Sequence, residues 1–199
     1  MAMRICFFGD SFVNGCGDPA MLGWVGRVCA RQGQGGHDLT LYNLGIRGDT
    51  SRDVLARWVA EAESRLKAHP NRRLVFSFGA NDAAQNVPRA ISLDHTARIL
   101  RAALAFAPTL MIGPAPIADD DVSDDRVASL CPHMASLCHS LGIAYLPVHA
   151  RLRQSSAWME EARAQDGAHP AIGGYTALAT LVEDWPHWQA WFQSSPISR

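Results

Sequence analysis

The sequence predicts an α/β protein, a three-layer α/β/α sandwich around a parallel sheet of about five strands, and three observations support this. Short runs rich in β-forming residues recur along the chain, at 3–8, 39–44, 74–78, 110–113 and 143–146. The intervals between them are long enough for helices, and strands that alternate with helices are typical of βαβ units. Runs such as Val75-Phe76-Ser77-Phe78 are almost continuously apolar, which favours strands that are covered on both faces.

Helical patterns occupy the intervals between these runs, at 21–32, 51–68, 92–107, 122–141 and 175–184. In the second of them, one side at helical spacing is predicted to contain Val54, Leu55, Trp58, Val59 and Leu66. Right-handed crossovers between parallel strands place such helices against the sheet. Because no repeat, low-complexity tract or long linker divides the chain, we expect a single domain over residues 1–199.

The composition of the chain argues against some classes of binding partner. The chain has 48% hydrophobic residues and a net charge of −1, so no basic field favours nucleic acid or anionic lipid. No apolar run approaches the roughly 20 residues of a membrane span. The first apolar run, 5–8, is too short for a signal peptide, and the five cysteines form no dense framework of the secreted type. We therefore expect a cytoplasmic protein.

Small and polar residues follow the first three predicted strands. Gly9-Asp10-Ser11 comes after the first, a segment from Asn43 to Thr50 after the second, and Gly79-Ala80-Asn81-Asp82 after the third. Open α/β sheets bind their ligands at the carboxyl ends of the strands. We therefore expect these residues to meet at one edge of the sheet and to form the functional site there.

Asp166 and His169 stand three residues apart near the C-terminus, a spacing that lets one turn bring the carboxylate to the imidazole. Taken singly, Ser11 fits a helix N-cap, His169 a core or surface histidine, and Asp166 a turn residue. Together they contain the parts of a catalytic triad, with Ser11 as nucleophile, His169 as base and Asp166 as the acid that orients the base.

Acyl transfer also needs hydrogen-bond donors for the negative charge that develops on the carbonyl oxygen. Three donors are predicted: the backbone N–H groups of Ser11 and Gly45 and the side-chain amide of Asn81. A tight turn at Gly45 and an Asx-turn at Asn81 are the structural alternatives.

These blocks resemble a known family, the SGNH hydrolases, also called GDSL-type lipases or esterases. The similar blocks are Gly9-Asp10-Ser11, Asn43-x-Gly45-x-x-Gly48-x-Thr50, Gly79-x-Asn81-Asp82 and Asp166-x-x-His169, in the family's order from residue 9 to residue 170. Phe12 departs from the family's name, which expects Leu. The resemblance implies a flavodoxin-like fold, an acyl-enzyme mechanism and an oxyanion donor from the first glycine of the second block.

The predicted activity is hydrolysis of a small-molecule acyl ester with no metal or other cofactor. Candidate substrate contacts are Asp10 and Asp82, beside the predicted nucleophile and amide, and Arg47, for which a surface ion pair is the alternative. Acyl length stays open between a small-acyl esterase and a longer-chain lipase or thioesterase. A flavin-binding module of the same fold is the non-enzymatic alternative.

Three other features have simpler structural interpretations. Cys131, His133, Cys138 and His139 are poorly spaced for zinc and fit a packed helix face. The acidic run 119–125 lacks the pattern of a calcium loop and favours a solvated loop before a helix. The aromatic residues at 185, 188, 191 and 192 favour docking of a last helix on the core, with a homo-oligomer contact as the alternative.

Overall fold

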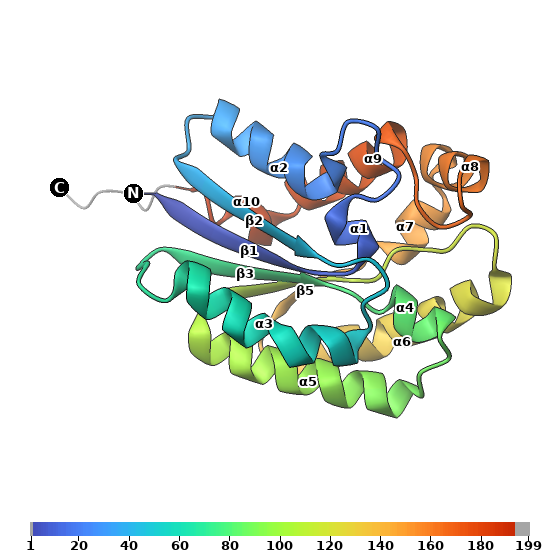
Figure 1. The fold of residues 1–199 in the computed structure, drawn as a ribbon, viewed down its shortest axis with the longest axis horizontal. Helices are drawn as coiled ribbons and strands as arrows, with labels where there is room; N and C mark the ends of the chain where they lie inside the picture. Colours follow the sequence, from blue (N-terminus) through green and yellow to red (C-terminus); the bar gives the residue numbers. More distant parts are fainter. Residues whose placement is uncertain (1, 194–199) are drawn as a thin grey trace.

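The computed structural model describes residues 2–193 and contains a five-stranded parallel sheet with helices on both faces (Figure 1). The strand order is β2-β1-β3-β4-β5. The strands are β1 Met3–Gly9, β2 Leu39–Gly45, β3 Arg72–Ser77, β4 Thr109–Ile112 and β5 Ala144–Leu146. The predicted α/β/α sandwich is confirmed, and both ends of each predicted strand lie within one residue of the observed ends, except at the start of β3, which lies two residues earlier than predicted.

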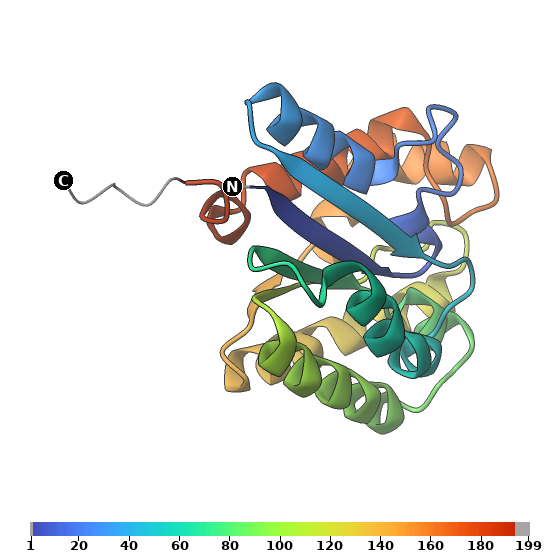
Figure 2. The ribbon, with the colours of Figure 1, turned by 60° about the vertical axis from the view of Figure 1, so that its left-hand side comes forward.

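Side chains of the central strand alternate between two separate cores. Ile5 and Phe7 face one core, while Cys6 and Phe8 face the other, and all four are fully buried. This alternation is the period-two geometry of a strand whose two faces are both covered. Each layer of helices therefore has its own apolar contact with the sheet, and Figure 2 shows the two layers on either side of it.

The helices divide between the two faces. Helices on the first face pack on the core that contains Phe7: α1 Ser11–Asn14, α2 Gly23–Gln34, α7 His149–Arg153, α8 Ser156–Ala164, α9 Ile172–Glu183 and α10 Pro186–Gln189. On the second face, α3 Ser51–Leu66, α5 Arg89–Phe106 and α6 Asp121–Ser140 pack on the core that contains Phe8. A short helix, α4 Ala80–Ala84, follows β3.

Five helices match the predicted ones, and the five that the sequence did not predict are short. Of the latter, α1, α4, α7 and α10 span only one turn or slightly more, too few residues for an apolar period to be visible. Helix α5 begins three residues earlier than predicted because Pro88 occupies its N-cap and Arg89 continues the helix. The acidic run also differs in part: Asp120 caps α6 as expected, but Asp124 is buried and pairs with His149 and Arg153.

The aromatic C-terminal segment docks on the core of the first face, as predicted. Trp188 is buried, with its ring centroid 6.2 Å from that of Phe7, and Trp185 is buried nearby. No helix of residues 2–193 is long and apolar enough to cross a membrane. All five cysteines are free, and among residues 2–193 no three His, Cys, Asp or Glu side chains gather as metal ligands.

Candidate functional site

The site begins where β1 ends between its two neighbours in the sheet. Gly9, the last residue of β1, is in register with Gly45 of β2 and Ser77 of β3. A Cβ atom at Gly9 would lie 1.9 Å from the Ser77 carbonyl oxygen, so only glycine fits between the strands. The residues that follow these three strands are thus brought together by the strand register itself, as the sequence predicts.

Ser11 is the first residue of the short helix α1, and Asp10 caps that helix. The Asp10 carboxylate accepts the Phe12 N–H at 3.0 Å. At the first helical position the Ser11 N–H has no carbonyl one turn earlier to accept it. The tight turn from strand to helix therefore fixes the Ser11 side chain, and among residues 2–193 the Ser11 N–H donates no hydrogen bond.

Ser11, His169 and Asp166 form one hydrogen-bonded chain. The Ser11 Oγ lies 2.6 Å from His169 Nε2, and His169 Nδ1 lies 2.7 Å from Asp166 Oδ2. Ser11 and His169 are 4% and 8% exposed, which keeps the pair largely out of bulk water while leaving it accessible. These three predicted residues, separated by up to 158 positions, meet in space.

The turn from Asp166 to His169 is arranged around the Asp166 carboxylate. Its Oδ1 accepts the backbone N–H groups of His169, at 2.9 Å, and Ala168, at 3.2 Å. Burial alone would raise the pKa of Asp166, but these bonds and the bond and charge of the His169 ring lower that pKa to about 2. Asp166 is therefore a carboxylate at neutral pH, able to orient His169 and stabilise its protonated form.

The expectation that Gly45 supplies an oxyanion donor is corrected by the structure. The Gly45 N–H already donates to Asn43 Oδ1 at 3.1 Å. A Cβ atom at Gly45 would lie 2.2 Å from the Asn14 backbone nitrogen, so its glycine is explained by close packing against α1. The tight-turn alternative does not apply either, because Gly45 is the last residue of β2 and its φ is not positive.

Gly48, three residues further along the same loop, has the properties expected of Gly45. Its φ of +87° is in the left-handed region, and a Cβ atom there would have no neighbour within 4 Å. Within residues 2–193 its N–H donates no hydrogen bond. The two glycines of the Asn43-x-Gly45-x-x-Gly48 block are alike in the sequence, and their hydrogen bonds, backbone conformation and packing tell them apart.

Asn81 is joined to the loop that contains Gly48. Its Nδ2 donates to the Asp49 carbonyl at 3.0 Å, which uses one of the two amide protons and leaves the second. Nearby, Gln85 Nε2 donates to the Gly48 carbonyl at 3.3 Å. Helix α4 and the loop after β2 are thus held together by side-chain amides, with donors left over at both.

Asp10 and Asp82 are not placed to contact a substrate, contrary to the prediction. Asp10 is 2% exposed. Burial raises the pKa of its carboxyl to about 7; the charges of Asp82 and Asp49 act in the same direction, and the hydrogen bond from the Phe12 N–H acts against them. Asp82 is 1% exposed and accepts both the N–H of Ser51, at 2.8 Å, and its hydroxyl, at 2.5 Å. Both carboxylates therefore support the backbone behind the site.

Arg47 lies at the site but contacts a predicted catalytic residue. Its Nη2 donates to Asp166 Oδ2 at 3.1 Å, and its side chain is 67% exposed. The surface ion pair that the sequence allowed is therefore present, and the partner of Arg47 in it is Asp166, the predicted acid.

Arg57 of α3 is a supporting residue that sequence reasoning missed. Its Nη2 donates to the carbonyls of Gly9, at 3.0 Å, and Leu44, at 2.8 Å, and its Nε donates to the Asp49 carboxylate at 2.7 Å. One guanidinium thus joins the ends of β1 and β2 to the loop of Gly48. Its position among apolar residues of the helix, between Ala56 and Trp58, gives no sign of these bonds in the sequence.

Comparison with known proteins agrees with this geometry. Residues 7–177 match the model of the GDSL-like lipase/acylhydrolase family. No match was found among curated protein sequences.

Several solved structures share the fold. One is a lipolytic G-D-S-L family protein from Veillonella parvula, with TM-score 0.76, 19% identity, and coverage of 94% of this chain and 99% of that one. A lipase/acylhydrolase from Enterococcus faecalis has TM-score 0.74 and 23% identity over 90% and 93%. An acetylxylan esterase from Geobacillus stearothermophilus has TM-score 0.72 and 16% identity over 97% and 95%. The chain belongs to the GDSL-like lipase/acylhydrolase family and is a carboxylic ester hydrolase.

Proposed function

We propose that the protein hydrolyses a carboxylic acyl ester through an acyl-enzyme on Ser11. The observation that carries this proposal is the chain of short contacts from Ser11 Oγ to His169 Nε2, at 2.6 Å, and from His169 Nδ1 to Asp166 Oδ2, at 2.7 Å. An imidazole protonated on Nδ1 donates to Asp166 and leaves Nε2 to accept the Ser11 proton. This is the arrangement that a serine nucleophile requires.

In the first half-reaction Ser11 Oγ bonds to the ester carbonyl carbon while its proton moves to His169 Nε2. The tetrahedral intermediate then loses the alcohol, which takes the proton from His169, and the acyl group stays on Ser11. In the second half, water loses a proton to His169 and attacks the acyl carbon; the acid is released and Ser11 regains its proton. Asp166 stays ionised and stabilises the imidazolium in both halves.

The oxyanion hole in this proposal consists of the Ser11 N–H, the Gly48 N–H and the Asn81 side-chain amide. Gly48 replaces the predicted Gly45 because the Gly48 N–H has no acceptor in residues 2–193, whereas the Gly45 N–H is bonded to Asn43. Preorganised donors of this kind stabilise the developing charge without reorganising during the reaction.

A relative supports the roles of Asp166 and His169. Two structures of the Geobacillus stearothermophilus acetylxylan esterase are of catalytic mutants in which an aspartate or a histidine, three positions apart, is replaced by alanine. Asp166 and His169 have the same spacing. The acid and base of this chain are therefore assigned to this pair.

The test is the esterase activity of purified Ser11→Ala with p-nitrophenyl acetate and p-nitrophenyl butyrate. We expect turnover to fall at least about 10⁴-fold, because the nucleophile is removed while the fold is kept. Cys16→Ser, a change of a neighbouring side chain outside the triad, is the control and should retain activity. Undiminished hydrolysis by Ser11→Ala would overturn the proposal.

A further inference from the structure

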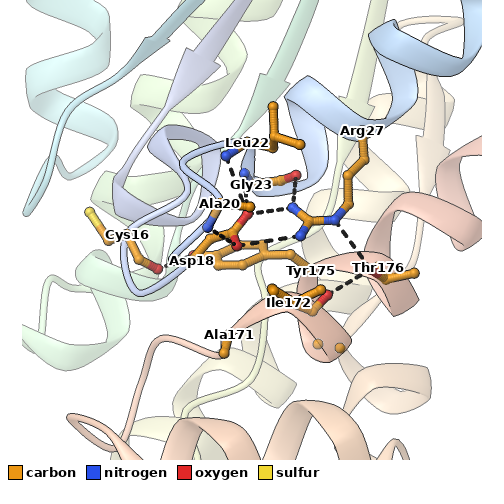
Figure 3. A network of polar contacts seen from close by, with 12 residues as sticks. Cys16, Asp18, Ala20, Leu22, Gly23, Arg27, Ala171, Ile172, Tyr175 and Thr176 are labelled. Atoms are coloured by element: carbon orange, nitrogen blue, oxygen red, sulfur yellow. Dashed lines mark hydrogen bonds and ion pairs between the residues drawn. The ribbon is translucent and has the colours of Figure 1, made fainter.

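Ser11 and His169 come from segments that no strand register connects. Ser11 follows β1 directly, whereas His169 lies in the connection between α8 and α9, two helices of the first face. Their side chains nevertheless approach to 2.6 Å. A separate device must hold the His169 segment against the Ser11 segment. The loop at 15–22, between α1 and α2, contacts both segments, and Figure 3 shows it beside the start of α9.

This loop contacts both segments through its first residues. The Cys16 N–H donates to the Ser11 carbonyl at 3.1 Å, and the Cys16 carbonyl accepts the Tyr175 hydroxyl of α9 at 2.7 Å. Gly17, at φ +86°, passes so close that a Cβ atom there would lie 3.0 Å from His169 Cβ and 2.8 Å from the Pro170 carbonyl oxygen. The backbone at Gly17 thus forms one wall against which His169 rests.

The conformation of the loop is set by one buried carboxylate. The Asp18 side chain has no exposed surface and accepts the backbone N–H groups of Ala20, at 3.0 Å, Leu22, at 3.3 Å, and Gly23, at 2.8 Å. It also pairs with the Arg27 guanidinium of α2. Burial acts to raise the pKa of Asp18, but the bonds from Arg27 and the backbone outweigh it, and the pKa is lowered.

Arg27 links the loop at 15–22 to α9. Its Nη1 also donates to the Gly23 carbonyl at 2.7 Å, and its Nε donates to Thr176 Oγ1 at 3.2 Å. Thr176 lies next to Tyr175, the residue that holds the Cys16 carbonyl. Figure 3 shows Asp18 and Arg27 between the loop and α9, so that one ion pair joins the start of α2, the loop and the helix that follows His169.

We propose that Asp18 and Arg27 are positioning residues for His169, a role that rests on the proposed function of the triad. By fixing the loop at Gly17 and tying it to α9, the pair sets the distance between His169 Nε2 and Ser11 Oγ. The expected effect is on the rate of the chemical step, because a displacement of about 1 Å at a reacting group is enough to cost about 100-fold in rate.

A second ion pair between the same helices provides a matched control. Arg31 of α2 pairs with Glu183 of α9, as Arg27 joins α2 to Thr176 of the same helix. Arg31 is 66% exposed, and its ion-pair partner Glu183 lies at the far end of α9 from His169. A change at Arg31 therefore tests the packing of α2 on α9 without touching the loop at Gly17.

The experiment compares Asp18→Asn with Arg31→Gln in kcat and KM for p-nitrophenyl acetate, in the rate at which a fluorophosphonate labels Ser11, and in Tm. We expect Asp18→Asn to lower kcat and the labelling rate by about 10- to 100-fold while KM changes less than about threefold. Arg31→Gln should leave both rates within about twofold, even though it lowers Tm. If Asp18 had a purely structural role, Asp18→Asn would lower Tm without lowering kcat relative to KM.

Two results would overturn the proposal: a folded Asp18→Asn whose kcat stays within about twofold of the parent, or an equal loss of kcat in Arg31→Gln. If Asp18→Asn does not fold, Arg27→Lys decides the question. It keeps the charge but loses the simultaneous bonds to Asp18, Gly23 and Thr176, so kcat should fall by about 3- to 10-fold, and an unchanged kcat refutes the role.

Ser11→Ala in the same assay separates the two proposals. If Ser11→Ala remains active, the proposed function fails and the positioning role falls with it. If Ser11→Ala is inactive and Asp18→Asn is fully active, only the positioning role fails.

Discussion

The strand-end part of the site and the His169 segment are held in place by different means. Ser11, Gly48 and Asn81 follow β1, β2 and β3, three adjacent strands whose register brings Gly9 beside Gly45 and Ser77. Asp166 and His169 follow no strand and reach the site from a connection between two helices.

This difference separates the part of the site that the strand topology positions from the part that needs additional contacts. Parallel strands in this order place whatever follows them at one edge of the sheet. A residue on a helix-to-helix connection gains nothing from that register, so its position depends on specific side-chain bonds. In this chain Asp18, Arg27 and Tyr175 make those bonds, and Arg57 reinforces the strand-end part.

The largest effects are expected at the His169 segment itself. His169→Ala should lower kcat by roughly 10⁴- to 10⁶-fold, because the proton of Ser11 loses its acceptor. Asp166→Ala should cost about 10- to 100-fold less, because the imidazole remains and loses only its orienting partner. Both are measured with p-nitrophenyl acetate at saturation, and a loss in Asp166→Ala that equals that of His169→Ala would contradict the assigned order.

Removing an oxyanion donor from the strand-end part should have the next largest effect. Asn81→Ala is expected to lower kcat by about 10²- to 10³-fold with little change in KM, since the amide acts on charge that develops in the transition state. Gln85→Ala removes a neighbouring amide that donates to the Gly48 carbonyl at 3.3 Å and should cost less than about threefold. A rise in KM with kcat unchanged would show that Asn81 only binds the substrate.

Loosening the strand-end part without touching the donors should cost less again. Arg57→Gln is expected to lower kcat by about tenfold, because the ends of β1 and β2 lose their shared donor and the Gly48 loop shifts. Arg65→Gln, on the same helix, is the control: Arg65 contacts Glu61, Ser64 and the Tyr42 ring and should leave kcat within about twofold. Equal kcat values for the two variants would mean that Arg57 does not position the site.

The smallest expected effect is on stability at Asp10. Its pKa is raised to about 7 by burial and then by the charges of Asp82 and Asp49, so the folded chain binds its proton more tightly than the unfolded chain. This contribution to stability is present below about pH 4 and is lost as the pH rises to about 7. Asp166, whose pKa is lowered to about 2, acts in the opposite direction and below about pH 4, outside this window.

Asp10→Asn keeps a helix-capping side chain and removes the titration. Between about pH 5 and about pH 8, its free energy of unfolding, measured by urea denaturation, should fall less than that of the parent chain. Parallel curves for the two proteins would contradict the raised pKa of Asp10.

The sequence predicted the strand-end part well because its signals are local. Apolar runs mark the strands, and the polar residues that end them must share one edge of a parallel sheet. The Asp166-x-x-His169 spacing was likewise sufficient to predict the turn that joins acid to base. Helix α8 was missed although Trp158, Met159 and Ala162 form an apolar face at helical spacing, because the helix has only nine residues.

What the sequence could not predict depends on which of several equivalent groups is left unbonded. The sequence does not distinguish Gly45 from Gly48, whereas the structure separates them by the bond from Gly45 to Asn43 and by the open space around Gly48. Asp10 and Asp82 adjoin the right residues, but burial turns them toward the backbone. In the sequence Asp18 resembles a turn residue and Arg27 a residue on a helix surface, because their pairing depends on how the loop at 15–22 folds back on α2.

Labelling with a fluorophosphonate, followed by mass spectrometry of the digested protein, tests the activated nucleophile most directly. Because the reagent reacts with a serine whose proton can be taken up, we predict a single adduct on the peptide that contains Ser11, lost in Ser11→Ala and strongly slowed in His169→Ala. An adduct on another serine, or labelling of Ser11 at the parent rate in His169→Ala, would contradict catalysis by the Ser11–His169 pair.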